Sequence, residues 1–156
     1  MHIPRLTQLA EWLEAGAPHK DGVDRFDMGH GVTVTSCGTA CCIAGAATQF
    51  FGGEVGQNLL QKAKHDYEEK TKERHLSPRG EAPWEGHDRI SGVFDRAMEL
   101  LELDLGEARE LFTPELIDPD FWALITPAEA AQTIRQMIAT GEVDWSHSKV
   151  LGNDVE

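Results

Sequence analysis

The chain is poor in positive charge and in aromatic residues, and it has no long apolar run. Its 156 residues include 14 lysines and arginines against 27 aspartates and glutamates, which gives a formal net charge of −13. A field of this sign repels nucleic acid and anionic membrane surfaces and attracts basic proteins. No apolar stretch approaches the roughly 18 residues of a membrane-spanning helix, and the first residues lack the apolar core of a signal peptide. We therefore expect neither direct nucleic-acid binding nor membrane association.

Cysteine is also scarce, and all three cysteines, Cys37, Cys41 and Cys42, fall in one short stretch. An odd, clustered set without a targeting segment is typical of reduced thiols in a cytoplasmic protein. No glycine-rich loop leads into Lys-Ser or Lys-Thr, so no nucleotide site is indicated. Cys37, Cys41 and His30 could offer three metal ligands, but the second ligand pair that is usual in zinc sites is missing. We predict neither a metal site nor a cofactor.

The thiols have two interpretations. Cys37 precedes an apolar helix predicted at 39–51, whose N-terminus would favour the reactive thiolate. With His30 as its base, Cys37 would be the nucleophile of a thiol-dependent hydrolase or transferase. In the favoured interpretation the cysteines are structural, and Cys41 and Cys42 are buried among small apolar residues. The substitution Cys42→Ser should then cost on the order of 1–3 kcal/mol, because a buried hydroxyl would lack a partner.

Hydrophobic periodicity predicts a mainly α-helical single domain with at most a small β-hairpin near 26–35. The β-branched run 32–35 is the predicted strand, with residues 26–28 as its nearest partner. The expected domain covers residues 1–145 and includes a charged surface insert at about 61–89, and a flexible tail follows over 146–156. Helices are predicted from Pro4 to Gly16, at 39–51, at 89–103, at 104–112 and from Thr126 to Gly141.

Two helix starts carry strong local signals. Asp104 and Glu107 have the spacing of a capping box. Thr126, Pro127 and Glu129 supply a cap, a proline at the first helical position and an acidic residue at the third. We therefore expect well-defined helix N-termini at both places.

Negative charge is concentrated in the second half of the chain. Residues 90–156 contain 4 lysines and arginines against 14 aspartates and glutamates. Many of these carboxylates lie opposite the predicted apolar stripes, and Glu99, Glu102, Glu107 and Glu110 form the predicted binding surface. Solubility alone is the simpler interpretation of this charge; the functional one is a surface that imitates a phosphate backbone.

We accordingly favour a cytoplasmic interaction or regulatory protein whose acidic surface binds a basic partner protein, including a partner that itself binds nucleic acid. The alternative function is the thiol-dependent enzyme with Cys37 as nucleophile and His30 as base. The oligomeric state does not follow from the pattern.

The cysteine stretch resembles a motif of small, uncharacterised bacteriophage and bacterial proteins. It reads Cys37-Gly38-Thr39-x-x-Cys42-Ile43-Ala44-Gly45-x-Ala47. Such proteins also carry a Phe-Asp/Asn-Met element before the motif and an Ile-Thr-Pro-x-x-Ala-Ala run leading to Gly-x-Val-Asp-Trp, which match residues 26–28, 125–131 and 141–145 here. The chain departs from that family at Ala46, where tryptophan is common, and in its long insert. The resemblance implies a shared fold and a phage-related protein, and it brings no activity.

Overall fold

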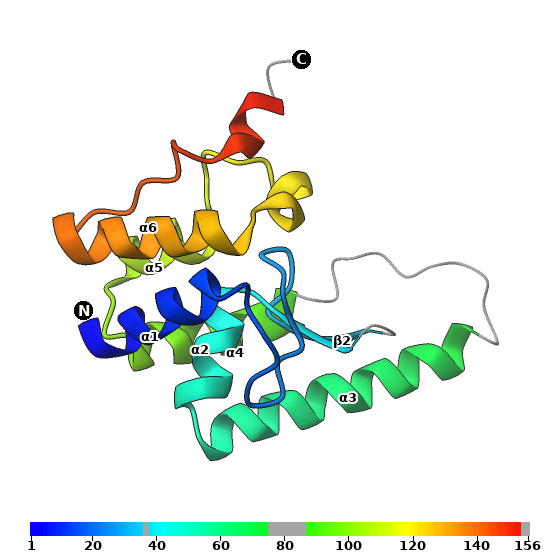
Figure 1. The fold of residues 1–156 in the computed structure, drawn as a ribbon. Helices are drawn as coiled ribbons and strands as arrows, with labels where there is room; N and C mark the ends of the chain where they lie inside the picture. The colour runs from blue at the N-terminus through cyan, green and yellow to red at the C-terminus, as the bar shows by residue number, and fades with distance from the viewer. Residues whose placement is uncertain (36–37, 75–86, 154–156) are drawn as a thin grey trace.

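The computed structural model describes residues 1–35, 38–74 and 87–153, with side chains described over 1–35, 38–69 and 92–151. It confirms the predicted mainly helical class with one small sheet (Figure 1). The α-helices are α1 (Ile3–Glu14), α2 (Ile43–Phe51), α3 (Glu54–Arg74), α4 (His87–Leu100), α5 (Leu105–Phe112) and α6 (Pro127–Thr140). The strands are β1 (Arg25–Phe26), β2 (Val32–Thr35) and β3 (Gly38–Cys41), and the 3-10 helices are η2 (Pro119–Leu124) and η3 (Lys149–Asn153).

The sheet has the strand order β1-β3-β2, with β3 parallel to β1 and antiparallel to β2. The predicted pairing of residues 26–28 with 32–35 is therefore wrong, because β3 lies between these two segments. The hairpin partner of β2 is the stretch that was predicted to begin the apolar helix. As a result, that helix begins at Ile43 rather than near residue 39.

Asp24 explains why residues 38–41 are extended. The backbone N–H of Thr39 donates to the Asp24 carboxylate at 2.7 Å, and the N–H of Asp24 donates to the Thr39 carbonyl at 2.9 Å. Gly38 precedes this pair with a φ of +108°, a conformation that residues with a Cβ rarely adopt. These contacts join residues 15 positions apart, so local propensity alone does not reveal them.

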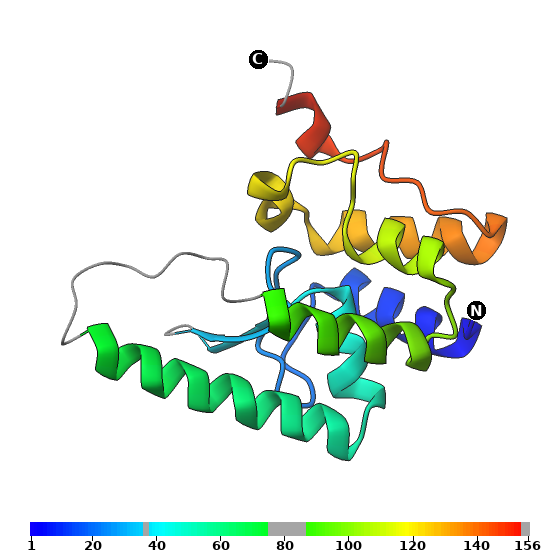
Figure 2. The same cartoon turned by 180° about the vertical axis from the view of Figure 1, so that it is seen from behind.

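Helix α2 is the centre of the fold, and it is buried along residues 43–48. α1 crosses it, with the Trp12 and Phe50 rings edge to face at 4.9 Å between centroids. α6 lies along α1 on the side away from α3 (Figure 1). α4 packs on the opposite face of α2, and the chain then continues into α5 (Figure 2).

Helix α3 takes up the first part of the predicted surface insert at 61–89. It contacts β2 and α2, and Leu59, Leu60 and Ala63 form its apolar side. Its other described side chains are mostly exposed. The insert is therefore helical as far as Arg74, whereas residues 75–86 lie outside the described part of the chain.

The capping boxes expected in the C-terminal half are confirmed. The Asp104 carboxylate accepts the Glu107 N–H at 2.8 Å, and the Glu107 carboxylate accepts the Asp104 N–H at 3.0 Å. Thr126 and Glu129 form the same reciprocal pair at the start of α6. Gly141, with a φ of +79°, ends that helix as predicted.

Residues 148–150 pack against α6, which differs from the loose tail expected over 146–156. Ser148 and Val150 are buried, and the backbone N–H of Lys149 donates to the Glu129 carboxylate at 2.9 Å. This hydrogen bond connects the end of the described chain to the first turn of α6. Residues 154–156 are outside the described ranges.

Candidate functional site

The cysteine stretch forms the junction between β3 and α2. Cys41 ends the strand and is fully buried, and Cys42 is the N-cap of α2. The sulfur of Cys42 accepts the backbone N–H of Gly45 at 3.4 Å. This position is usually held by serine, threonine, aspartate or asparagine. Here the Cys42 sulfur takes that role and accepts the Gly45 N–H, which has no backbone partner within the helix. The expected burial of both cysteines is confirmed.

Gly45 allows the turn at residues 29–31 to lie directly on the first turn of α2. A Cβ atom at Gly45 would overlap the carbonyl oxygen of Gly31. The backbone N–H of Cys42 also donates to the carbonyl of His30 at 2.7 Å. The glycine of the motif is therefore required by packing between two backbone segments.

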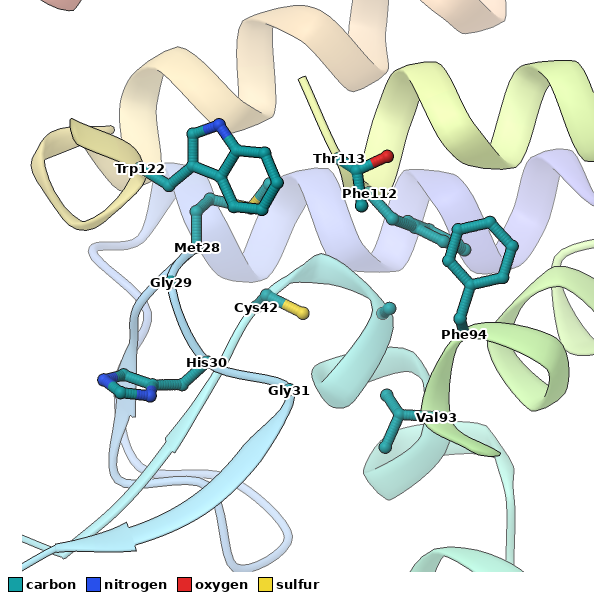
Figure 3. A pocket seen from close by; sticks show the side chains of 11 residues that line it. Met28, Gly29, His30, Gly31, Cys42, Val93, Phe94, Phe112, Thr113 and Trp122 are labelled. Carbon is teal, nitrogen blue, oxygen red and sulfur yellow. The ribbon is translucent and has the colours of Figure 1, made fainter. Parts of the chain in front are cut away.

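A small pocket opens beside Cys42 (Figure 3). Its volume is about 40 Å³, and its walls are mainly apolar, with Met28, Phe94, Phe112 and Trp122 among the lining side chains. One water molecule needs roughly 10–15 Å³ of such space. The pocket has room for a few water molecules and is too small for a metabolite.

The described thiols are not prepared for nucleophilic attack. Burial raises the pKa of Cys42 above its ordinary value, and the hydrogen bonds from the N–H groups of Gly45 and Ala44 oppose this only in part. Burial, with a smaller contribution from the neighbouring Cys42, also raises the pKa of Cys41 strongly. Because the thiolate is the nucleophile, both groups stay in the unreactive thiol form at neutral pH.

His30 does not meet the Cys42 thiol. Its ring points away from the pocket, whereas the sulfur of Cys42 points into it (Figure 3). The His30 Nε2 lies 3.7 Å from the Asp27 carboxylate, and that carboxylate also accepts the N–H of Gly29 at 2.8 Å. Cys37, the predicted nucleophile, lies outside the described residues, so its pairing with His30 stays a prediction.

Within the described ranges, no three histidine, cysteine, aspartate or glutamate side chains gather in a way that could hold a metal ion. None of the helices in the same ranges is both long enough and apolar enough to cross a membrane.

The acidic side chains of the C-terminal half lie at the surface. Residues 92–151 contain twelve aspartates and glutamates and four lysines and arginines. Ten of these carboxylates are exposed, and the other two, Glu107 and Glu129, are the glutamates at the third helical position of the two capping boxes. Two of the basic side chains already pair with glutamates, Arg96 at 3.1 Å and Arg135 at 2.7 Å. Negative charge on this half is therefore exposed and largely uncompensated.

The four predicted binding residues differ in their local roles. Glu102 and Glu110 are exposed and form no ion pair among the described residues, and the exposed Glu99 pairs with Arg96. Glu107 is half-buried, and its carboxylate accepts the N–H of Asp104. Three of the four carboxylates are thus exposed to a partner, whereas Glu107 caps α5.

A larger groove, absent from the sequence-based expectations, lies between the loops that follow α5 and α6. It has a volume of about 390 Å³ and is lined by Glu110, Glu115, Leu116, Val143 and Trp145. The indole N–H of Trp145 donates to the carbonyl of Glu110 at 2.8 Å and ties the two segments together. Leu116 is 61% exposed. Two sequence signals could have pointed here, namely a leucine in an acidic, proline-containing loop and the Gly-x-Val-Asp-Trp run at 141–145.

Comparisons of the chain with protein-family models, curated proteins and solved structures gave no match. What can be inferred about function therefore depends on the residues of this chain alone.

Proposed function

We propose that this protein is an interaction module that binds a basic partner protein through the acidic surface of its C-terminal half. The observation that carries the proposal is the charge imbalance over residues 92–151, where ten exposed carboxylates stand among only four basic side chains. Exposed charge of one sign creates a field that speeds the approach of oppositely charged partners and disfavours others.

The chemistry of the surface suggests the class of partner. Exposed carboxylates accept charge-assisted hydrogen bonds from lysine and arginine, as phosphate oxygens do. A partner that normally binds a nucleic-acid backbone would therefore find a competing surface here. In that role the protein acts as an inhibitor.

The surroundings of Cys41 and Cys42 give no support for thiol chemistry at these two residues. Cys41 and Cys42 are buried, burial raises the pKa of both thiols, and the ring of His30 points away from the Cys42 sulfur. The described residues of the cysteine motif are accounted for by the junction between β3 and α2, whereas the exposed Glu102, Glu110 and Glu115 form no ion pair among the described residues.

The test is a selection from a library of displayed protein fragments, with the wild-type chain and the variant Glu99→Gln/Glu102→Gln/Glu110→Gln as parallel baits. Glutamine removes the charge at nearly constant size, and the variant leaves the Glu107 cap intact. We expect net-basic fragments to be enriched on the wild-type bait and lost from the variant. Their affinity should fall steeply with salt, because the Debye length shrinks from about 10 Å at 0.1 M to about 3 Å at 1 M.

Fragments without a charge bias, or equal binding to both baits at both salt concentrations, would leave the carboxylates with a role in solubility only. A Cys37→Ala bait serves as a further control and should bind as the wild type does. Loss of the selected fragments on that bait would favour the thiol-dependent alternative instead.

A further inference from the structure

We infer that the groove between Glu110 and Trp145 is the docking site for a short amphipathic segment of the basic partner. The segment carries lysine or arginine on both sides of an aliphatic side chain. This inference rests on the proposed function, and it specifies where the partner binds and which chemistry is recognised.

The walls of the groove are held in place by the fold. Glu110 belongs to the last turn of α5, directly before the fully buried Leu111. The Trp145 side chain is only 3% exposed, and its N–H···O bond to Glu110 links two segments that are 35 residues apart. A site whose walls are already fixed loses less conformational entropy when a ligand binds.

The groove has the size of a binding site. Its volume of about 390 Å³ falls within the roughly 300–1,000 Å³ that is usual for ligand pockets. The hollows beside Cys42 and Ala63 measure about 40 and 60 Å³, which is room for a few water molecules. Of these three hollows, only the groove can take in the side chains of a peptide.

The lining combines an apolar floor with an acidic rim. Trp145 and the half-buried Val143 supply apolar surface, and Leu116 leaves 61% of its area exposed beside them. Burial of such surface by a partner is favourable. Glu110 and Glu115 are exposed and form no ion pair among the described residues. An aliphatic side chain flanked by basic ones matches this arrangement.

Charge also decides between possible occupants. Residues 104–120 and 140–148 together contain eight carboxylate side chains and one arginine. The last residues of the chain, Gly152 to Glu156, are themselves acidic, and a second copy would bring another net charge of −13. Like charges disfavour both of these occupants, which leaves a basic segment of a different protein.

Two synthetic lysine-rich peptides test the inference by titration calorimetry, one with a central leucine pair and one with serines in those places. We expect the leucine peptide to bind the wild-type chain at least about tenfold more tightly than the serine peptide. Leu116→Asn should remove most of this difference. Leu124→Asn is the matched control, because Leu124 is 54% exposed and is not among the residues that line the groove, so it should change nothing.

A second pair of variants separates the groove from the general acidic surface. Glu110→Gln/Glu115→Gln and Glu99→Gln/Glu102→Gln remove the same charge, but only the first pair alters the groove rim. We expect the first pair to weaken the leucine peptide about tenfold and the second about twofold. Binding should also shift the NMR resonance of the Trp145 indole N–H.

Equal weakening by both pairs, with no effect of Leu116→Asn, would overturn the groove and leave the acidic-surface proposal standing. Failure of the leucine peptide to bind the wild-type chain would overturn the groove as well. If the fragment library also returned no charge bias, the proposed function would fall with it.

Discussion

The hollow beside Cys42 and the groove beside Trp145 differ in size and in the chemistry of their walls. The first has about 40 Å³ and mainly apolar walls, and it adjoins the most conspicuous motif of the chain. The second has about 390 Å³ and two carboxylates at its rim, and it is built from the last turn of α5 and the loops that follow α5 and α6, including Val143 and Trp145 of the Gly-x-Val-Asp-Trp run. The cysteine motif thus lies beside the smaller of the two hollows.

This contrast separates residues that build the fold from residues that can meet a partner. Around Cys42, each small residue has a packing role, since Cys42 caps α2 and Gly45 admits the carbonyl of Gly31. Around Trp145, the exposed Leu116 and two unpaired glutamates satisfy no described contact of the fold. In this molecule, exposed side chains without a role in the fold therefore indicate a binding site better than the cysteine motif does.

The largest expected effect is that of Gly45→Ala on stability. The added Cβ would overlap the backbone carbonyl of Gly31, which cannot move without disturbing the turn that precedes β2. We expect a loss of about 3 kcal/mol or more in the free energy of unfolding, measured by urea denaturation. The matched control is Gly92→Ala in α4, where a Cβ has nothing within 4 Å.

Gly92→Ala should stabilise the protein by about 0.5–1 kcal/mol, because alanine favours the helix interior. If Gly45→Ala were as harmless as this control, the packing explanation of the motif would be wrong. The contrast between the two hollows would then lose its basis.

The two buried cysteines should respond differently to serine. Cys41 is fully buried on β3, and its sulfur has no hydrogen-bond partner among the described residues, so Cys41→Ser should cost on the order of 1–3 kcal/mol. Cys42→Ser places a good N-cap residue where the Gly45 N–H is already presented, and it should change stability by less than about 1 kcal/mol.

This replaces the sequence-based expectation for Cys42, which assumed that a hydroxyl there would lack a partner. Thermal unfolding of the two variants provides the comparison. A Cys42→Ser variant as unstable as Cys41→Ser would show that the N-cap hydrogen bond does not compensate for burying the hydroxyl.

The parts of the fold that could be predicted are those decided by nearby residues. The capping boxes at Asp104 and Thr126 each depend on a partner three residues away, so the sequence displays them directly. The strand at 38–41 depends on Asp24 and on β2, whereas the apolar run 40–47, to which its last two residues belong, favours a buried helix when read alone. Long-range pairing therefore overrode the local preference.

The candidate site follows the same rule. Exposed positions for Glu99, Glu102 and Glu110 could be anticipated from helix periodicity, whereas the capping role of Glu107 makes it a poorer binding residue than expected. The sequence signals near Leu116 and Trp145 do not show that the two segments meet, because the groove forms only where Trp145 contacts the carbonyl of Glu110.

Two tryptophans offer a direct comparison of the hollows. Trp122 borders the hollow beside Cys42, and its indole N–H donates to the carbonyls of Ile117 at 2.9 Å and Pro114 at 3.2 Å. Trp145 borders the groove and donates to the carbonyl of Glu110 at 2.8 Å. Each substitution to phenylalanine removes one indole N–H donor and should cost about 1 kcal/mol. Only Trp145→Phe should also weaken the leucine peptide, by about threefold to tenfold in calorimetry. Equal peptide affinities for both variants would contradict a groove held open by Trp145.

The smallest expected effect concerns Glu129, which joins the start of α6 to residues 148–150. Burial opposes its ionisation, but hydrogen bonds from Ser148, Thr126 and the Lys149 N–H outweigh burial and lower the pKa of Glu129 below its ordinary 4.5. A carboxyl with a lowered pKa stabilises the folded state fully above its unfolded pKa, and the stabilisation disappears as the pH falls through the folded value. Glu129→Gln keeps an oxygen for the Thr126 cap but loses the acceptor of the Lys149 N–H, so at pH 7 it should lose about 1 kcal/mol from the helix N-terminal charge and this hydrogen bond together. The difference from wild type in urea unfolding should shrink as the pH falls below about 4.5.

Glu142→Gln removes the same charge from an exposed position and is the control. A Glu129→Gln difference that persisted unchanged at low pH would mean that the amide disturbs the packing of residues 148–150, and that the charge itself contributes nothing there.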